Sequence, residues 1–383
     1  MAFALYIHWP FCLAKCPYCD FNSHVREGID LARWQAALLA DMAHEAALTG
    51  GRELTSIFFG GGTPSLMPPA LVAALIEAAS RHWRFAEGIE MTLEANPSSV
   101  EAANFAALAH VGINRVSLGL QALDDAALGF LGRLHNAAEG LAALEVAQRH
   151  FERVSFDLIY ARPDHTPDLW EAELTRALAL GTGHLSLYQL TIEPGTRFAT
   201  LVREGKFTPL DDDAAGDLFT LTRELTAAAG LPAYEISNHA RTGEESRHNL
   251  VYWRYQDYVG IGPGAHGRRG GFATVRHRKP ENFLKAVTAQ HHGLAEIREL
   301  ASREQAAEAL LMGLRLAEGL APAALAARFG LAESDLIDPA KRAFYIAQGL
   351  LSERTDSLIV TDAGMPLLDG LLAELVPAGL VAA

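Results

Sequence analysis

Short apolar runs alternate with longer segments of helical periodicity over the first two thirds of the chain. A short run rich in β-branched and aromatic side chains is typical of a buried strand, whereas apolar positions three and four residues apart are typical of an amphipathic helix. The pattern predicts helices over about residues 30–47, 69–80 and 99–111. It predicts strands at residues 4–8, 56–59, 89–94, 115–119, 154–160 and 184–190.

This alternation of strands and helices predicts an α/β fold. Strands separated by helices pair in parallel through right-handed crossovers, so a partial (β/α)6 barrel over residues 1–210 is the favoured closure. In such barrels the functional residues lie at the carboxyl ends of the strands. Three polar residues are expected there, because Glu94 ends the third strand, Gln121 follows the fourth and Asp157 lies within the fifth.

The pattern changes after the sixth strand. A helix is expected over about residues 214–229 and a strand at residues 233–238. We assign residues 211–300 to an extension of the barrel. Residues 301–383 contain mostly short amphipathic helices, with a β-wing expected near residues 349–364. They predict a small, mostly helical C-terminal domain of winged-helix type.

Composition and charge narrow the class of protein. Of 383 residues, 50% are apolar and 20% are charged, as in ordinary globular proteins. No run of about 18 apolar residues and no signal peptide is visible, so no membrane span is expected. The net charge of −14 argues against nucleic acid as a partner, and leaves room for peripheral membrane contact only through a local basic patch. Clustered cysteines indicate a reducing compartment, so a cytoplasmic protein is expected.

All three cysteines of the chain lie on one expected loop after the first strand. Cys12, Cys16 and Cys19 have the spacing C-x3-C-x2-C, which suits a 4Fe–4S cluster with three irons held by cysteine and one open. The alternatives are a zinc site with His8 as fourth ligand, or three incidental thiols. Zinc motifs usually bring two cysteine pairs, and this sequence has no second pair. The pattern therefore favours the cluster.

Two further features are expected near the cysteine loop. Residues 60–64, Gly-Gly-Gly-Thr-Pro, follow an apolar strand and lack the lysine of a phosphate-binding loop. Such a segment is either a tight turn or, beside an open iron, a bare backbone that holds the amino group of a ligand. Glu94 and Asp157 are either buried acids satisfied by barrel neighbours or acids that bind ribose hydroxyls or an amine.

A distant segment combines imidazole, amide and two large aromatic side chains. His248, Asn249, Tyr252 and Trp253 are suited to holding a flat apolar macrocycle, with the imidazole as ligand to its metal. The alternative is that these residues pack a strand onto the barrel. The loop Gly260–Gly267 is either a tight connection or the far side of a pocket.

The cysteine spacing resembles the signature of the radical S-adenosylmethionine superfamily, and residues 60–64 resemble its glycine motif. Nearly the whole chain is similar to the oxygen-independent coproporphyrinogen III oxidase group, through residues 6–12, 60–65, 94–97, 117–121 and 157–160. The resemblance implies a radical S-adenosylmethionine type of partial barrel in which Cys12, Cys16 and Cys19 hold the 4Fe–4S cluster. It implies contacts to S-adenosylmethionine from Tyr6, Tyr18, Gly61, Gly62, Thr63, Glu94, Gln121, Arg133 and Asp157.

Two branches of that group are relevant. The oxidase branch has a further cysteine two positions after the third ligand, where this chain has Phe21. It also has an N-terminal extension, which is not expected in this chain. Residues 248–253 match the H-N-x-x-Y-W signature of the haem chaperone branch, which implies haem binding by His248, Asn249, Tyr252 and Trp253.

The haem chaperone resemblance implies a protein that binds haem as cargo and passes it to haem-dependent respiratory proteins. Its implied partners are haem or a porphyrin, a haem acceptor and an electron donor. The alternative is the oxidase, which converts coproporphyrinogen III to protoporphyrinogen IX by oxidative decarboxylation. The resemblance leaves open whether the haem chaperone branch uses its radical chemistry catalytically.

Overall fold

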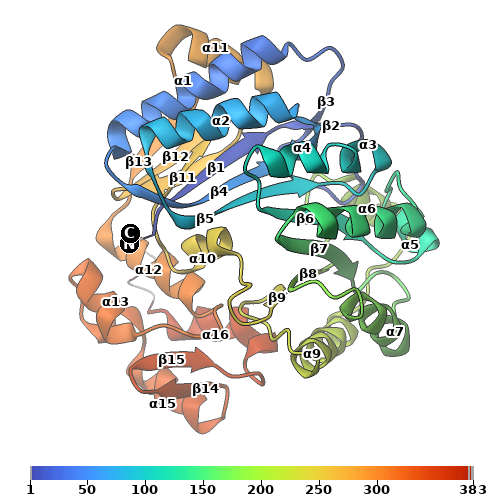
Figure 1. Cartoon of the computed structure of the whole chain (residues 1–383). Helices are drawn as coiled ribbons and strands as arrows, with labels where there is room; N and C mark the ends of the chain where they lie inside the picture. Colours follow the sequence, from blue (N-terminus) through green and yellow to red (C-terminus); the bar gives the residue numbers. More distant parts are fainter. Residues whose placement is uncertain (1, 378–379, 381–383) are drawn as a thin grey trace.

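One large sheet organises the molecule. Among residues 2–377 and 380, which the computed structural model describes, eleven strands form this sheet. Its centre consists of six parallel strands in chain order (Figure 1), as the α/β pattern predicts. These are β1 (Ala4–Trp9), β4 (Glu53–Gly61), β5 (Arg84–Ala95), β6 (Arg115–Gln121), β7 (Arg153–Tyr160) and β8 (His184–Gln189).

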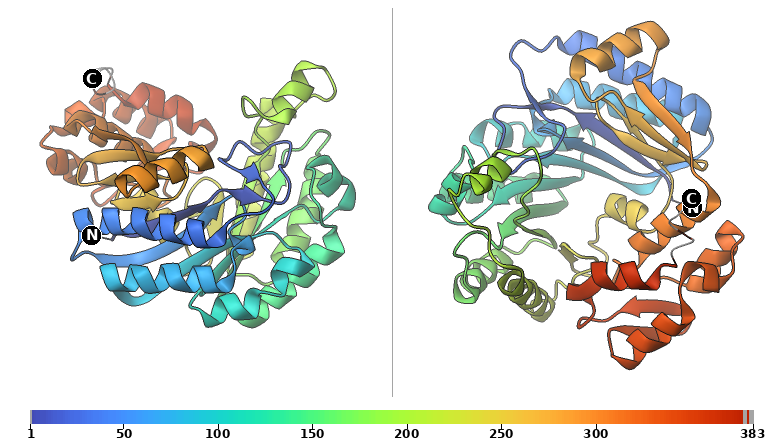
Figure 2. Two further views of the ribbon diagram at one scale, coloured as in Figure 1. Left: turned by 90° about the horizontal axis from the view of Figure 1, so that it is seen from above. Right: turned by 180° about the vertical axis from the view of Figure 1, so that it is seen from behind.

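Helices cover the convex face of the sheet. Figure 2 shows this layer from above, and from behind it shows the sheet curving around α10 (Arg247–Trp253). The expected helix over residues 99–111 is instead split in two by a turn at residues 103–104. The helices between the parallel strands are α1 (Leu31–Thr49), α2 (Pro69–His82), α3 (Ser99–Ala102), α4 (Phe105–His110), α5 (Asp125–Phe130), α6 (Ala137–His150) and α7 (Pro167–Leu178).

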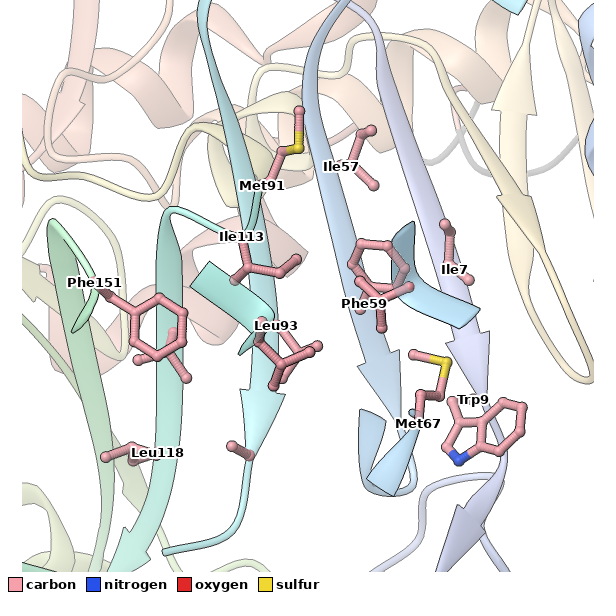
Figure 3. Packing of buried hydrophobic residues seen from close by; sticks show 14 of the residues in the cluster. Ile7, Trp9, Ile57, Phe59, Met67, Met91, Leu93, Ile113, Leu118 and Phe151 are labelled. Carbon is pink, nitrogen blue, oxygen red and sulfur yellow. The ribbon is translucent and has the colours of Figure 1, made fainter. Parts of the chain in front are cut away.

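The two faces of the sheet differ in chemistry. Ile7, Phe59 and Leu93 are fully buried in the core between the sheet and the helices (Figure 3). Because successive strand residues point to opposite faces, their neighbours Tyr6 and Glu94 point to the concave side. The apolar pattern that predicts the strands therefore also places their polar residues in the interior of the barrel.

Further strands extend both edges of the sheet. Strand β10 (Tyr258–Ile261) pairs in parallel with β1, and three antiparallel strands follow it. The strand expected at residues 233–238 is wrong: the chain turns there, and the edge strand begins only at Asn238. The carboxylate of Glu235 accepts hydrogen bonds from the Ser237 backbone and the Asn238 side chain, which compete with strand pairing. The remaining edge strands are β9 (Asn238–Ala240), β11 (His266–Arg269), β12 (Phe272–Arg276) and β13 (Leu294–Glu299).

A buried ion-pair network fastens this extension to α1. Arg276 pairs with Asp41 and Glu45, and all three side chains are fully buried. Asp41 also accepts a hydrogen bond of 3.1 Å from the Gly262 backbone. Breaking such a network is costly because it leaves a buried charge uncompensated. The network therefore holds the loop after β10 firmly in place.

The C-terminal region has its own apolar core. A hairpin of β14 (Leu351–Arg354) and β15 (Ser357–Val360) stands at the position of the expected β-wing, before the last helices. No helix in the described ranges is long and apolar enough to cross a membrane. The other helices of the second half are α8 (Arg197–Arg203), α9 (Asp212–Ala228), α11 (Pro280–Gln290), α12 (Ser302–Gly313), α13 (Pro322–Phe329), α14 (Glu333–Leu336), α15 (Pro339–Ala347) and α16 (Leu368–Leu375).

Candidate cluster and ligand site

The three cysteines lie together at the carboxyl end of the barrel. They are free thiols and line one cavity of about 370 Å³. The Thr63 hydroxyl donates a hydrogen bond to Cys12 Sγ, and the Arg133 guanidinium donates one to Cys16 Sγ, both at 3.4 Å. Burial raises the pKa of the Cys12 and Cys19 thiols, so a positively charged metal centre is needed to hold them as thiolates at neutral pH.

The geometry bears on the choice between cluster and zinc. His8 is not directed at the cysteines, because its ring nitrogens are hydrogen-bonded to the Tyr6 hydroxyl and the Asn22 carbonyl, both at 2.9 Å. In the part of the chain that the structure describes, no group of three Cys, His, Asp or Glu side chains is placed so that it could hold a single metal ion. Three thiols around an open cavity, with donors directed at two sulfurs, fit a cluster that has one open iron.

The glycine loop lines the same cavity and is tightly constrained. Gly61 has φ +114°, and a Cβ there would lie 2.6 Å from the His8 ring. A Cβ on Gly62 would lie 2.7 Å from the Phe11 carbonyl oxygen. The amides of Gly61, Gly62 and Thr63 donate to protein acceptors, so the loop is a tight turn as well as a cavity wall.

Two acids, Glu94 and Asp157, line the cavity. Glu94 accepts a hydrogen bond of 3.1 Å from the Gly61 amide, and Asp157 accepts one of 3.2 Å from the Ser117 hydroxyl. Burial, followed by the charge of Asp157, raises the pKa of Glu94 to about 8. Burial also raises the pKa of Asp157 to about 6. Acids with raised pKa values in a cavity are candidates for ligand binding.

Arg133 connects the cluster loop to the strand ends. It donates to the Asn96 side chain at 2.6 Å and to the Gly119 carbonyl at 2.9 Å, in addition to Cys16. Asn96, which was not among the expected ligand residues, also donates to the Thr63 hydroxyl at 3.1 Å. The expected ligand residues that line the first cavity are Tyr18, Gly61, Gly62, Thr63, Glu94, Gln121, Arg133 and Asp157.

Tyr6 lines a second cavity of about 350 Å³ beside the first. The two cavities share Phe21, Gly61 and Glu94. The expected loop Gly260–Gly267 contributes Gly264 and His266 to this cavity, whereas its other lining residues after position 255, Tyr258 and Arg278, were not expected there. Its lining residues are Tyr6, His8, Phe21, Asn22, Gly61, Glu94, Tyr252, Tyr258, Gly264, His266 and Arg278.

The four residues of the H-N-x-x-Y-W segment do not converge on one cavity. His248 is buried, with hydrogen bonds to the Ser56 hydroxyl at 2.9 Å and the Tyr252 hydroxyl at 2.7 Å. Burial lowers the pKa of His248 to about 3. Asn249 donates to the Tyr234 hydroxyl, and the Trp253 indole nitrogen is buried without a partner in the described ranges. Of the four, Tyr252 lines the second cavity.

A parallel partial barrel with three cysteines and a glycine loop at its carboxyl edge defines a radical S-adenosylmethionine protein. A model of the radical SAM superfamily matches residues 6–175, and a model of the HemN C-terminal domain matches residues 300–367. Curated relatives named heme chaperone HemW are 32–37% identical over 90–97% of this chain, so the chain belongs to the HemW-like group of this superfamily.

Relatives of known sequence match along almost the whole chain. The mouse protein "Radical S-adenosyl methionine domain-containing protein 1, mitochondrial" is 39% identical, over 98% of this chain and 87% of its own length. Heme chaperone HemW of Escherichia coli is 37% identical, over 96% of this chain and 97% of its own length. The solved structure of Escherichia coli coproporphyrinogen III oxidase, HemN, has a TM-score of 0.82 at 22% identity, covering 97% of this chain and 89% of that chain. That likeness shows the common fold.

Proposed function

We propose that this protein is a haem chaperone, which binds haem and passes it to haem-dependent respiratory proteins. The observation that carries the proposal is the 37% identity to Escherichia coli heme chaperone HemW over nearly the full length of both chains. The heme chaperones HemW of Haemophilus influenzae and Bacillus subtilis, at 36% and 32% identity, support it further. Phe21, in place of the cysteine expected of the oxidase branch, is consistent with this choice.

Cys12, Cys16 and Cys19 would hold a 4Fe–4S cluster, and the first cavity would hold S-adenosylmethionine. Together these groups supply one-electron chemistry when bound. The protein residues orient and shield the ligand. Glu94 and Asp157 provide oxygens for hydroxyl or amine groups, and Arg133 fixes the loop position of Cys16. Tyr6, Tyr18, Gln121 and the glycine loop complete the wall.

The H-N-x-x-Y-W residues support the haem site in this proposal. Tyr252 forms a wall of the second cavity, and the hydrogen bond between its hydroxyl and the His248 ring sets the position of that hydroxyl. Asn249 fixes α10 within the barrel through its hydrogen bond to the Tyr234 hydroxyl. The free thiols are consistent with a reducing, cytoplasmic compartment. The expected protein partners are an electron donor and a haem acceptor. The net charge of −14 is consistent with membrane contact that is at most peripheral.

Two assays on one anaerobic, cluster-loaded preparation test the proposal. Titration with haem is expected to give a saturable Soret band. Incubation with coproporphyrinogen III, S-adenosylmethionine and a reductant is expected to give no protoporphyrinogen IX. Formation of protoporphyrinogen IX would support the oxidase instead, and the absence of any saturable Soret band would contradict the haem chaperone.

A further inference from the structure

His266 differs from His8, which also lines the second cavity, and from His248, which is hydrogen-bonded to Tyr252 of the cavity wall. His8 and His248 each have both ring nitrogens in hydrogen bonds. The side chain of His266, the first residue of β11, is exposed at the cavity, and within residues 2–377 and 380 no hydrogen bond to its ring is found. Partial burial, followed by the charge of Arg278, lowers its pKa. A neutral imidazole with an available nitrogen is a ligand for iron.

The loop that carries His266 is fixed to the cysteine loop. The side-chain amide of Asn22, three positions after Cys19, donates to the Pro263 and Arg278 carbonyl oxygens, each at 2.9 Å. The Gly262 amide is held by the buried Asp41. His266 is therefore presented by a braced backbone, beside the cavity wall that Phe21, Gly61 and Glu94 share with the cluster site.

The groups around His266 match the parts of a haem. Phe21 is 64% exposed on the same cavity, so a flat aromatic surface is available to a macrocycle. Arg278 is exposed and is in no ion pair within the described chain, so its guanidinium is available to a propionate. A volume of about 350 Å³ lies near the lower limit for drug-sized ligands. A haem is larger than this volume, so it would lie across the opening of the cavity rather than wholly inside it.

We propose that His266 is the axial ligand to haem iron at the mouth of the second cavity, with Phe21 against the macrocycle and Arg278 paired with a propionate. This inference rests on the proposed haem chaperone function and assigns its iron ligand to a residue outside the H-N-x-x-Y-W segment. It places the cargo next to the cluster and S-adenosylmethionine site, across Gly61 and Glu94.

Titration of the full-length, cluster-loaded protein with ferric haem tests the assignment. His266→Ala is expected to weaken haem binding at least tenfold and to change the Soret maximum to that of a protein lacking the histidine ligand. Added imidazole is expected to restore the wild-type spectrum in this variant, which a merely structural role would not produce. His150→Ala, which changes an exposed histidine at the end of α6, is the matched control and is expected to bind as wild type. Iron content of each variant verifies that the cluster site is intact.

The outcomes separate this inference from the function on which it rests. His248→Ala removes the residue that positions Tyr252, so it is expected to weaken haem binding but to keep the histidine-ligated spectrum. Unchanged affinity and spectrum in His266→Ala would overturn the assignment, as would loss of the histidine-ligated spectrum in His248→Ala alone, while the haem chaperone function would stand. A wild-type protein without saturable haem binding would overturn both.

Discussion

The two ends of the barrel interior use polar residues in opposite ways. At the amino end, Glu90 accepts hydrogen bonds from Arg153 at 2.6 Å and from the His248 amide at 3.0 Å, and the Ser155–His184–Tyr234 chain continues the network. At the carboxyl end, acids with raised pKa values line two cavities. Paired polar groups stabilise the fold, whereas groups directed into a cavity remain available to ligands.

The largest expected effect is a loss of metal binding at the carboxyl end of the barrel without a loss of folding stability. Cys16→Ser is expected to remove nearly all cluster iron after anaerobic reconstitution, because a hydroxyl is a poor replacement for a thiolate ligand. The free energy of unfolding of the metal-free protein is expected to change by less than about 0.5 kcal/mol. Iron analysis and denaturant unfolding measure the two effects. Lys15→Ser, on the same loop, is the control and keeps its iron; equal iron in both variants would contradict the cluster assignment.

At the amino end of the barrel, we expect the opposite result, which is a loss of folding stability. Arg115 and Arg153 hold the pKa of Glu90 below its usual range, although burial opposes this shift. Glu90→Gln removes the charge that compensates the two guanidinium groups, and is expected to lower the free energy of unfolding by about 3–5 kcal/mol. Urea unfolding measures the change.

An exposed pair provides the comparison for this variant. Glu77 pairs with Arg81 on the surface of α2, and Glu77→Gln is expected to cost less than about 1 kcal/mol. Equal stability losses in Glu90→Gln and Glu77→Gln would show that the amino-end network stabilises the fold no more than an exposed ion pair does.

The pH dependence of stability tests the carboxyl end. An acid with a pKa raised from 4.5 to about 8 on folding contributes its full stability below pH 4.5 and loses it as the pH rises towards 8. Wild-type stability without added ligand is therefore expected to fall between roughly pH 5 and pH 8. Glu94→Gln is expected to flatten this decline, and to be more stable than wild type at about pH 8 by on the order of 1 kcal/mol or more. A slope unchanged from wild type would show that Glu94 ionises normally.

The contrast between the two ends also explains what the sequence could predict. The order of strands and loops along the chain placed Glu94, Asp157, the cysteine loop and the glycine loop at the carboxyl edge of the sheet. The pairing of His248 with Ser56, 192 positions away, has no local signal, because it depends on how α10 enters the barrel. The second cavity was anticipated only in part, through the loop Gly260–Gly267, because it joins residues 6–94 to residues 252–278.

The smallest expected effect concerns an exposed aromatic residue at the cavity mouth. Because Phe21 is 64% exposed, Phe21→Ala is expected to change the free energy of unfolding by less than about 0.5 kcal/mol. Loss of its contact with a macrocycle is expected to weaken haem binding about two- to tenfold. Phe344→Ala is the matched control, because Phe344 is 54% exposed on α15 in the C-terminal region. If the two variants bind haem equally well, Phe21 is simply an exposed aromatic residue, and the macrocycle does not contact it.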